Sequence, residues 1–204
     1  MIKNIIFDWS GVIKDAINDQ LLVVNKIFKN FGISEISLEE LKENWEEPYM
    51  IFFNKYLPKL TLEQEQATYK KVILDLPRGR CFPGVVEVLK KFKEAEVEMA
   101  ILSSDLPETV LPEIKEFGLE NVFADIVTGM HNKSESLREL INRNNFKIQE
   151  TIFIGDSRQE IEEGKNAGVK TGAVTWGFYA KERLEALKPD FIINNLEELK
   201  LIVS

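Results

Sequence analysis

Residues 2–9, IKNIIFDW, form a short run of β-branched and aromatic side chains that leads into the turn-forming pair Ser10 and Gly11. The run predicts a buried strand that carries Asp8 to its carboxyl end. Four later runs look alike and a fifth is a candidate edge strand; they span residues 97–103, 124–128, 151–155, 170–175 and 190–193. Strands that are apolar at nearly every residue are typical of a parallel sheet whose two faces are both covered by helices.

Helical patterns separate these strands. They cover residues 84–95, 107–117, 133–143, 159–167 and 180–187. The alternation of strand and helix from about residue 83 onward predicts a doubly wound α/β domain. Sheets of this kind bind ligands outside the carboxyl ends of their strands, and Asp8, Ser103 and Asp156 fall there.

The segment 15–81 breaks the alternation, because it carries helical periodicity only. We predict helices at residues 16–31, 38–46, 49–56 and 62–74. Capping boxes mark two of the starts, Ser37 with Glu40 and Thr61 with Gln64. We therefore predict an all-helical cap at 15–81, inserted after the first strand of a core formed by 1–14 and 82–204, with hinges near Lys14 and in the Pro- and Gly-rich segment 77–83.

Composition narrows the classes of partner. Among 204 residues, 34 acidic side chains outnumber 26 basic ones, and the net charge of −8 disfavours nucleic acid and anionic membranes. Cys81 is the only cysteine, which excludes an intrachain disulfide and a cysteine-built metal site and predicts a cytosolic location. The N-terminal apolar run is too short for a signal sequence or a membrane span. The chain is long enough to fold as a stable monomer, and a homodimer is the alternative oligomeric state.

Acidic residues end two of the predicted strands. Asp8 can act as a covalent nucleophile from such a position, and Asp156 lies in the sequence Gly-Asp-Ser, with Glu160 four residues later. Taken alone, either aspartate is typical of a residue that caps a turn or a helix. Two of them at one sheet edge favour a functional site, and oxygens from Asp8, Asp156 and Glu160 suit Mg²⁺.

Three further residues surround this edge. The hydroxyl of Ser103 and the following backbone N–H of Ser104 can hold a phosphate oxygen at a helix N-terminus. Lys133 opens a helix, where a cation opposes the helix dipole, and this local cost suggests that it neutralises phosphate or carboxylate charge. His131 is the only histidine, and we interpret it as a solvated loop residue, with a catalytic role as the alternative.

The chain resembles the haloacid dehalogenase superfamily. The four sequence motifs of that superfamily correspond to FDWSGVIKD at 7–15, AILSSD at 100–105, Lys133, and IFIGDSRQEI at 152–161. Their order and approximate spacing are also those of the superfamily. The resemblance covers about residues 1–14 and 82–204 and implies a Rossmann-like sheet. The insertion matches, in position and type, the helical cap of the phosphoglycolate-phosphatase-like and β-phosphoglucomutase-like branch.

The resemblance also implies roles and a Mg²⁺ cofactor. Asp8 matches the nucleophile that becomes an aspartyl phosphate, Ser103 the phosphate-binding hydroxyl, and Lys133 the charge-neutralising lysine. Asp156 matches a metal-binding acid, and the main-chain carbonyl of Ser10 falls where the family supplies another metal ligand. Glu160 stands where a second acid is usual. It contributes to the metal site directly, through a water molecule, or through Lys133.

Position 10 departs from the family pattern. Most phosphatases of the superfamily carry there a second aspartate as general acid and base, and the hydroxyl of Ser10 does neither job easily. Val12 replaces a usual threonine, a milder change. The expected function is that of a Mg²⁺-dependent phosphatase, a phosphoric monoester hydrolase, acting on a small phosphorylated metabolite. A phosphotransferase or mutase, or a catalytically weak binding or regulatory protein, is the alternative.

Other side chains have less specific patterns. Tyr49, Phe52, Phe53 and Tyr56 lie at helical spacing, which favours a core stripe over a face for substrate specificity. Cleavage of a C–P bond would need a Schiff-base lysine in the cap, where Lys55 and Lys59 are the only candidates we name. Arg78 and Arg80 can reach an anionic substrate from the hinge, although solvated cations are the default interpretation.

Overall fold

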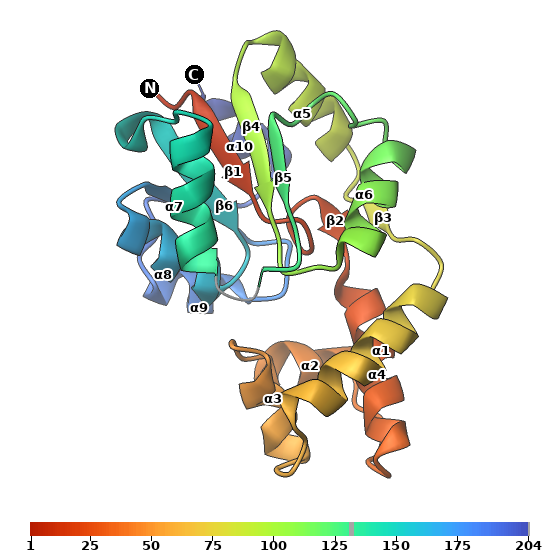
Figure 1. Ribbon diagram of the computed structural model, residues 1–204. Helices are drawn as coiled ribbons and strands as arrows, with labels where there is room; N and C mark the ends of the chain where they lie inside the picture. Colours follow the sequence, from red (N-terminus) through yellow and green to blue (C-terminus); the bar gives the residue numbers. More distant parts are fainter. Residues whose placement is uncertain (131–132, 204) are drawn as a thin grey trace.

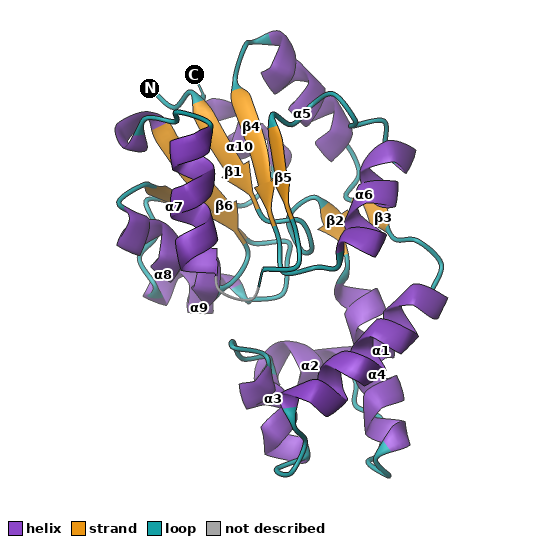
Figure 2. Ribbon diagram, in the orientation of Figure 1, coloured by secondary structure: helices purple, strands orange, loops and turns teal. Residues whose placement is uncertain are grey.

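Six parallel strands form the central sheet of the computed structural model, which describes residues 1–130 and 133–203 (Figures 1 and 2). The strands are β1 (Asn4–Phe7), β4 (Glu98–Leu102), β5 (Asp125–Val127), β6 (Thr151–Gly155), β7 (Lys170–Val174) and β8 (Phe191–Ile193). Their order across the sheet is β5-β4-β1-β6-β7-β8. The doubly wound α/β fold predicted from the sequence is therefore confirmed, with β8 at one edge.

Register places the candidate residues together. Strand β1 lies between β4 and β6, and Phe7 pairs with Ile101 on one side and Ile154 on the other. The residues that follow these partners leave the sheet at one edge, because all three strands run in the same direction. Asp8 therefore emerges between the loops that carry Ser103 and Asp156.

Helices cover both faces of the sheet, as the apolar strands require. Ile5 and Phe7 of β1 pack into a cluster with α5 (Val85–Glu94), α6 (Pro107–Glu116) and α10 (Leu196–Leu201). Ile6 points the other way, into a cluster with α7 (Lys133–Arg143). Helix α8 (Arg158–Ala167) packs beside α7, and α9 (Lys181–Ala186) precedes β8.

The insertion forms four helices beyond the carboxyl ends of the strands (Figure 1). They are α1 (Ile17–Asn30), α2 (Leu38–Asn44), α3 (Met50–Tyr56) and α4 (Leu62–Asp75). The Ser37 hydroxyl accepts a hydrogen bond from the backbone N–H of Glu40, and the capping box of Thr61 and Gln64 is complete. Phe28 stacks on Phe52 inside the bundle, with ring centroids 6.1 Å apart.

A small second sheet joins the insertion to the core. Strands β2 (Lys14–Asp15) and β3 (Arg80–Cys81) pair antiparallel at the points where the chain leaves and returns. The sequence predicted hinges here but not this pairing, because two-residue strands are too short for a pattern of alternation. Helix α10 and the 3₁₀ turn η1 (Ile148–Glu150) were not predicted either.

The insertion and the core share hydrophobic packing. One buried cluster contains Phe28 and Phe52 of the insertion together with Ile161, Tyr179 and Leu184 of the core. The assignment of residues 15–81 as a separate domain therefore stays a prediction. No helix among the described residues is both long and apolar enough to cross a membrane.

Candidate active site

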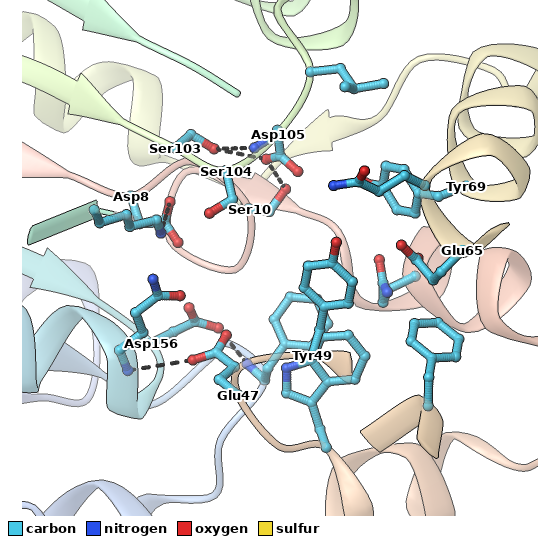
Figure 3. Close-up of a pocket in the computed structure, with 18 of the residues that line it drawn as sticks. Asp8, Ser10, Glu47, Tyr49, Glu65, Tyr69, Ser103, Ser104, Asp105 and Asp156 are labelled. Carbon is cyan, nitrogen blue, oxygen red and sulfur yellow. Dashed lines mark hydrogen bonds and ion pairs between the residues drawn. The ribbon is translucent and has the colours of Figure 1, made fainter. Parts of the chain in front are cut away.

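A pocket of about 390 Å³ lies between the carboxyl edge of the sheet and the helical insertion (Figure 3). Its core side includes Asp8, Ser10, Ser103, Asp105, Lys133 and Asp156. Its cap side includes Trp45, Glu47, Tyr49, Phe53, Glu65 and Tyr69. The structure thus brings the strand-end residues singled out from the sequence into one pocket.

Three carboxylates and one lysine form the centre of the site. Asp8, Asp156 and Glu160 are buried, and each offers an oxygen atom within 4.8 Å of the other two. Lys133, at the start of α7, lies between them: its Nζ is 3.1 Å from Asp8 Oδ1 and 2.6 Å from Glu160 Oε1. The predicted charge-neutralising lysine is therefore in contact with the predicted nucleophile.

This centre holds three acidic groups and one basic group. Burial raises the pKa of Asp8 to about 8, although the neighbouring Lys133 acts in the opposite direction. Burial also raises the pKa of Asp156 well above its usual value, and the charges of Glu160 and Asp8 add to the effect. Burial of Glu160 acts to raise its pKa, but the neighbouring Lys133 outweighs this effect and holds the pKa below its usual range. One lysine does not balance three buried carboxylates, so the centre favours a further cation.

The surroundings of Asp156 leave space for its carboxylate. A Cβ atom at Gly11 or at Gly177 would lie 2.1 Å from Asp156 Oδ2, so neither position tolerates a side chain without movement. The backbone N–H of Phe178 donates to the same oxygen at 2.6 Å and fixes its orientation. Asp156 and Asp8 thus present oriented carboxylate oxygens, the ligand type that Mg²⁺ prefers.

Glu160 is arranged differently. Its Oε1 accepts from Lys133 Nζ at 2.6 Å, and its Oε2 accepts a hydrogen bond from the Ser157 hydroxyl. Both oxygens therefore already have protein partners. Of the three roles left open by the sequence, this arrangement favours the one in which Glu160 acts through Lys133.

The loop after β4 forms the wall on which a phosphate would rest. Ser103 and Ser104 both line the pocket just before α6. The Ser104 hydroxyl donates to the carbonyl of Met130 at 2.9 Å, which ties this loop to the loop after β5. His131 lies outside the described residues.

Asp105 is a pocket carboxylate that our sequence analysis missed. The Ser10 hydroxyl donates to Asp105 Oδ2 at 2.7 Å, and the Ser103 hydroxyl donates to the same atom at 3.1 Å (Figure 3). A carboxylate therefore stands beside the position at which most phosphatases of the superfamily carry their second aspartate. The signal was in the quoted stretch AILSSD, whose last residue is a third acid at a strand end.

Glu47, in the insertion, reaches the same centre and was also missed. Its carboxyl group contacts the Ser157 hydroxyl, whose single proton it shares with Glu160, and it accepts a hydrogen bond from the backbone N–H of Gln159 at 3.4 Å. Burial raises the pKa of Glu47 to about 7, and the charge of Glu160 contributes. No local pattern could have paired residues that are 110 positions apart in the sequence.

Several other candidates lie elsewhere. Lys55 and Lys59 are exposed and do not line the pocket. Arg78 pairs with Glu116, and Arg80 Nε lies 3.6 Å from Asp15 Oδ2, so the hinge cations point away from the site. In the aromatic stripe, Phe52 is core, as the preferred interpretation expected, whereas Tyr49 and Phe53 also line the pocket.

The chain is similar to known proteins over most of its length. The family model of haloacid dehalogenase-like hydrolases matches residues 5–174. A phosphoglycolate phosphatase of Synechococcus elongatus is 24% identical over 96% of this chain and 94% of its own length. The pyrophosphatase PpaX of Halalkalibacterium halodurans is 27% identical over 99% of this chain and 97% of its own.

Solved structures show the same fold. A haloacid dehalogenase-like hydrolase from Streptococcus pneumoniae superposes with a TM-score of 0.84 at 18% identity, over 100% of this chain and 99% of that one. The family match spans most of the chain, including the strand ends that carry Asp8 and Asp156. The chain therefore belongs to the haloacid dehalogenase-like hydrolases, as its four motifs predicted.

Proposed function

We propose that the protein is a Mg²⁺-dependent phosphatase that cleaves a small phosphorylated metabolite through an aspartyl phosphate on Asp8. The observation that carries the proposal is the contact of Asp8 with Lys133 in a buried carboxylate cluster at the pocket between the sheet edge and the insertion. Curated relatives named as phosphatases support it. The single cysteine supports a cytosolic location.

In the first step, an oxygen of Asp8 attacks the phosphorus atom, and the bond from phosphorus to the leaving-group oxygen breaks. Lys133 and the Ser103 hydroxyl lie where they can stabilise charge on the phosphoryl oxygens. Asp8, Asp156 and the Ser10 carbonyl would hold a magnesium ion that neutralises charge on the phosphoryl group. Glu160 and Ser157 orient the lysine through the hydrogen bonds described above.

The proton transfers need a second group, and we assign them to Asp105. Its carboxyl, held by the hydroxyls of Ser10 and Ser103, gives a proton to the leaving-group oxygen and becomes a carboxylate. In the second step it takes a proton from the water that attacks the phosphorus atom. The bond between phosphorus and Asp8 then breaks, which releases phosphate and regenerates the free carboxylate.

Asp105 also bears on the alternatives. The reading of the chain as a weak binding or regulatory protein rested on the missing carboxylate at position 10, and Asp105 places a carboxylate in contact with that residue. A phosphotransferase or mutase would use the same first step, but the phosphoryl group would pass to a second substrate instead of water. No further observation in the described residues favours that outcome.

Phosphate release from a panel of phosphorylated metabolites, measured with Mg²⁺ and with excess EDTA, tests the proposal. We expect Mg²⁺-dependent release from at least one compound and none in EDTA. Tight binding of phosphate esters without release would contradict a phosphatase. Transfer to an added acceptor at the expense of release would favour the phosphotransferase.

A further inference from the structure

One wall of the pocket contains a buried carboxylate that the phosphatase mechanism does not use. Glu65, in α4, is only 2% exposed, and Tyr49 and Tyr69 lie beside it on the cap side (Figure 3). A hydrogen bond from Tyr49 supports the carboxylate, but burial still raises the pKa of Glu65 to about 7. Burying a carboxylate in a pocket wall is costly unless hydrogen-bond donors approach it.

The ionisable groups around Glu65 are mostly acidic. Glu47 and Asp105 also line the pocket beyond the carboxylate centre. Lys133 and Lys70 are the only lysine or arginine side chains among the described residues that line it. Lys133 is held by Asp8 and Glu160, and Lys70 is 54% exposed and pairs with Glu108 at 2.8 Å. The cap side therefore lacks a buried cation, within the described part of the chain, for a negatively charged leaving group.

We infer that the leaving group carries no negative charge and donates hydrogen bonds to Glu65, as the hydroxyls of a sugar or polyol do. This inference rests on the proposed phosphatase function and names its substrate class. A carboxylate or a second phosphate on the leaving group would face Glu65 and Glu47 without a compensating cation, whereas hydroxyl groups satisfy the buried acceptor. Glu65 is thus a specificity-determining residue. The relatives are named for phosphoglycolate and for pyrophosphate, substrates whose leaving groups carry negative charge, so the inference separates this chain from them.

The test compares kcat/KM for hexose and polyol monophosphates with kcat/KM for 2-phosphoglycolate and inorganic pyrophosphate, using p-nitrophenyl phosphate as the common reference. We expect the best hydroxyl-bearing substrate to exceed both anionic ones by about tenfold or more, the effect of one hydrogen bond to a charged group. In Glu65→Gln, which keeps the side-chain shape, the ratio of kcat/KM for hydroxyl-bearing to anionic substrates should fall by about tenfold. Glu63→Gln, at an exposed position of the same helix, is the matched control and should leave the ratio unchanged.

The outcomes separate the two proposals. Turnover of p-nitrophenyl phosphate together with a preference for 2-phosphoglycolate or pyrophosphate overturns the substrate class and leaves the phosphatase intact. An equal change of kcat/KM for all substrates in Glu65→Gln also overturns it, because a purely structural role would act in that way. Absence of Mg²⁺-dependent turnover of every substrate, p-nitrophenyl phosphate included, overturns the phosphatase and the inference with it.

Discussion

The hydroxyl of Ser10 connects position 10 of the sequence to Asp105 by a hydrogen bond of 2.7 Å. If Asp105 exchanges protons with the leaving group, Asp105→Asn should lower turnover of alkyl phosphates by about 10²- to 10⁴-fold. The loss should be smaller for p-nitrophenyl phosphate, because its leaving group departs without a proton. Steady-state rates on the two substrate classes check this, and equal losses on both would count against proton transfer.

Ser10→Asp tests the same assignment from the other side. The substitution places a second carboxylate against Asp105, close to the already crowded Asp8, and like charges in contact disfavour ionisation. We expect turnover to fall. A gain on alkyl phosphates, with faster decay of the phosphoenzyme, would show that the missing carboxylate limits the protein as it stands and that Asp105 does not replace it.

Asp156, in the loop after β6, and Glu160, in the first turn of α8, should differ in their importance for metal binding. Asp156→Asn removes a carboxylate oxygen of the type that Mg²⁺ prefers, oriented by the backbone N–H of Phe178, whereas Glu160→Gln alters a group whose oxygens are both engaged by protein. The Mg²⁺ concentration at half-maximal activity should therefore rise more in Asp156→Asn. Equal shifts in the two titrations would mean that Glu160 binds the metal directly.

At the scale of elements, a buried ion pair secures the start of the insertion. Lys14 Nζ, in β2, lies 2.7 Å from Glu113 Oε1, in α6, and both side chains are buried. The indole N–H of Trp9 donates to Glu113 Oε2 at 2.8 Å, and the backbone N–H of Gly79 donates to Oε1 at 3.2 Å. One carboxylate thus joins both hinge segments to the core.

Removing that carboxylate should be costly, because the buried Lys14 ammonium loses its closest ionic partner and keeps the Asp19 carboxylate at 3.8 Å. We expect Glu113→Ala to lower the free energy of unfolding by about 3–5 kcal/mol in urea titrations. Glu116→Ala in the same helix breaks an exposed pair with Arg78 and should cost about 1 kcal/mol or less. The double variant Lys14→Met with Glu113→Leu should recover part of the loss, because it removes the buried charges, while the N–H groups of Trp9 and Gly79 still lose their acceptor. Equal losses for Glu113→Ala and Glu116→Ala would refute this role.

At the scale of the whole molecule, the insertion closes the pocket by direct contacts with the core. The rings of Trp45 and Phe178 lie 5.7 Å apart, and Arg183 pairs with Glu46 at 3.3 Å. These contacts make the insertion the second wall of the site. They also cover core side chains, among them Tyr179 and Leu184, which are buried in the shared cluster.

Deletion of residues 16–76, with the ends bridged, should leave a folded core, because every strand of the large sheet lies outside the deleted segment. Substrate discrimination should be lost, and solubility should fall because the covered apolar surface becomes exposed. Circular dichroism and a cooperative unfolding transition report the fold, while kcat/KM values report discrimination. A chain that no longer folds would show that the insertion belongs to the core.

The sequence was informative where chemistry and periodicity coincide locally. Strand β6 and the Asp156 that follows it, the capping box of Thr61, and Lys133 at a helix start could all be recognised within short windows. Glu65 could not, because on a cap helix it resembles any other polar residue, and only tertiary packing buries it. Glu47 was missed for a related reason, because its partner Ser157 lies 110 positions away. Asp105 did have a local signal in the stretch AILSSD, and only its contact with Ser10 depends on tertiary structure.

The central claim is that Asp8 becomes covalently phosphorylated, and intact-mass measurement of rapidly acid-quenched protein tests it most directly. With Mg²⁺ and a turned-over substrate, wild-type protein should carry one added phosphoryl group, which hydroxylamine removes because an acyl phosphate is labile to it. Asp8→Asn should carry none, although its circular dichroism stays that of the wild type, since the amide keeps the shape but is not a nucleophile. A phosphoryl group in Asp8→Asn, or undiminished phosphate release by that variant, would contradict the account.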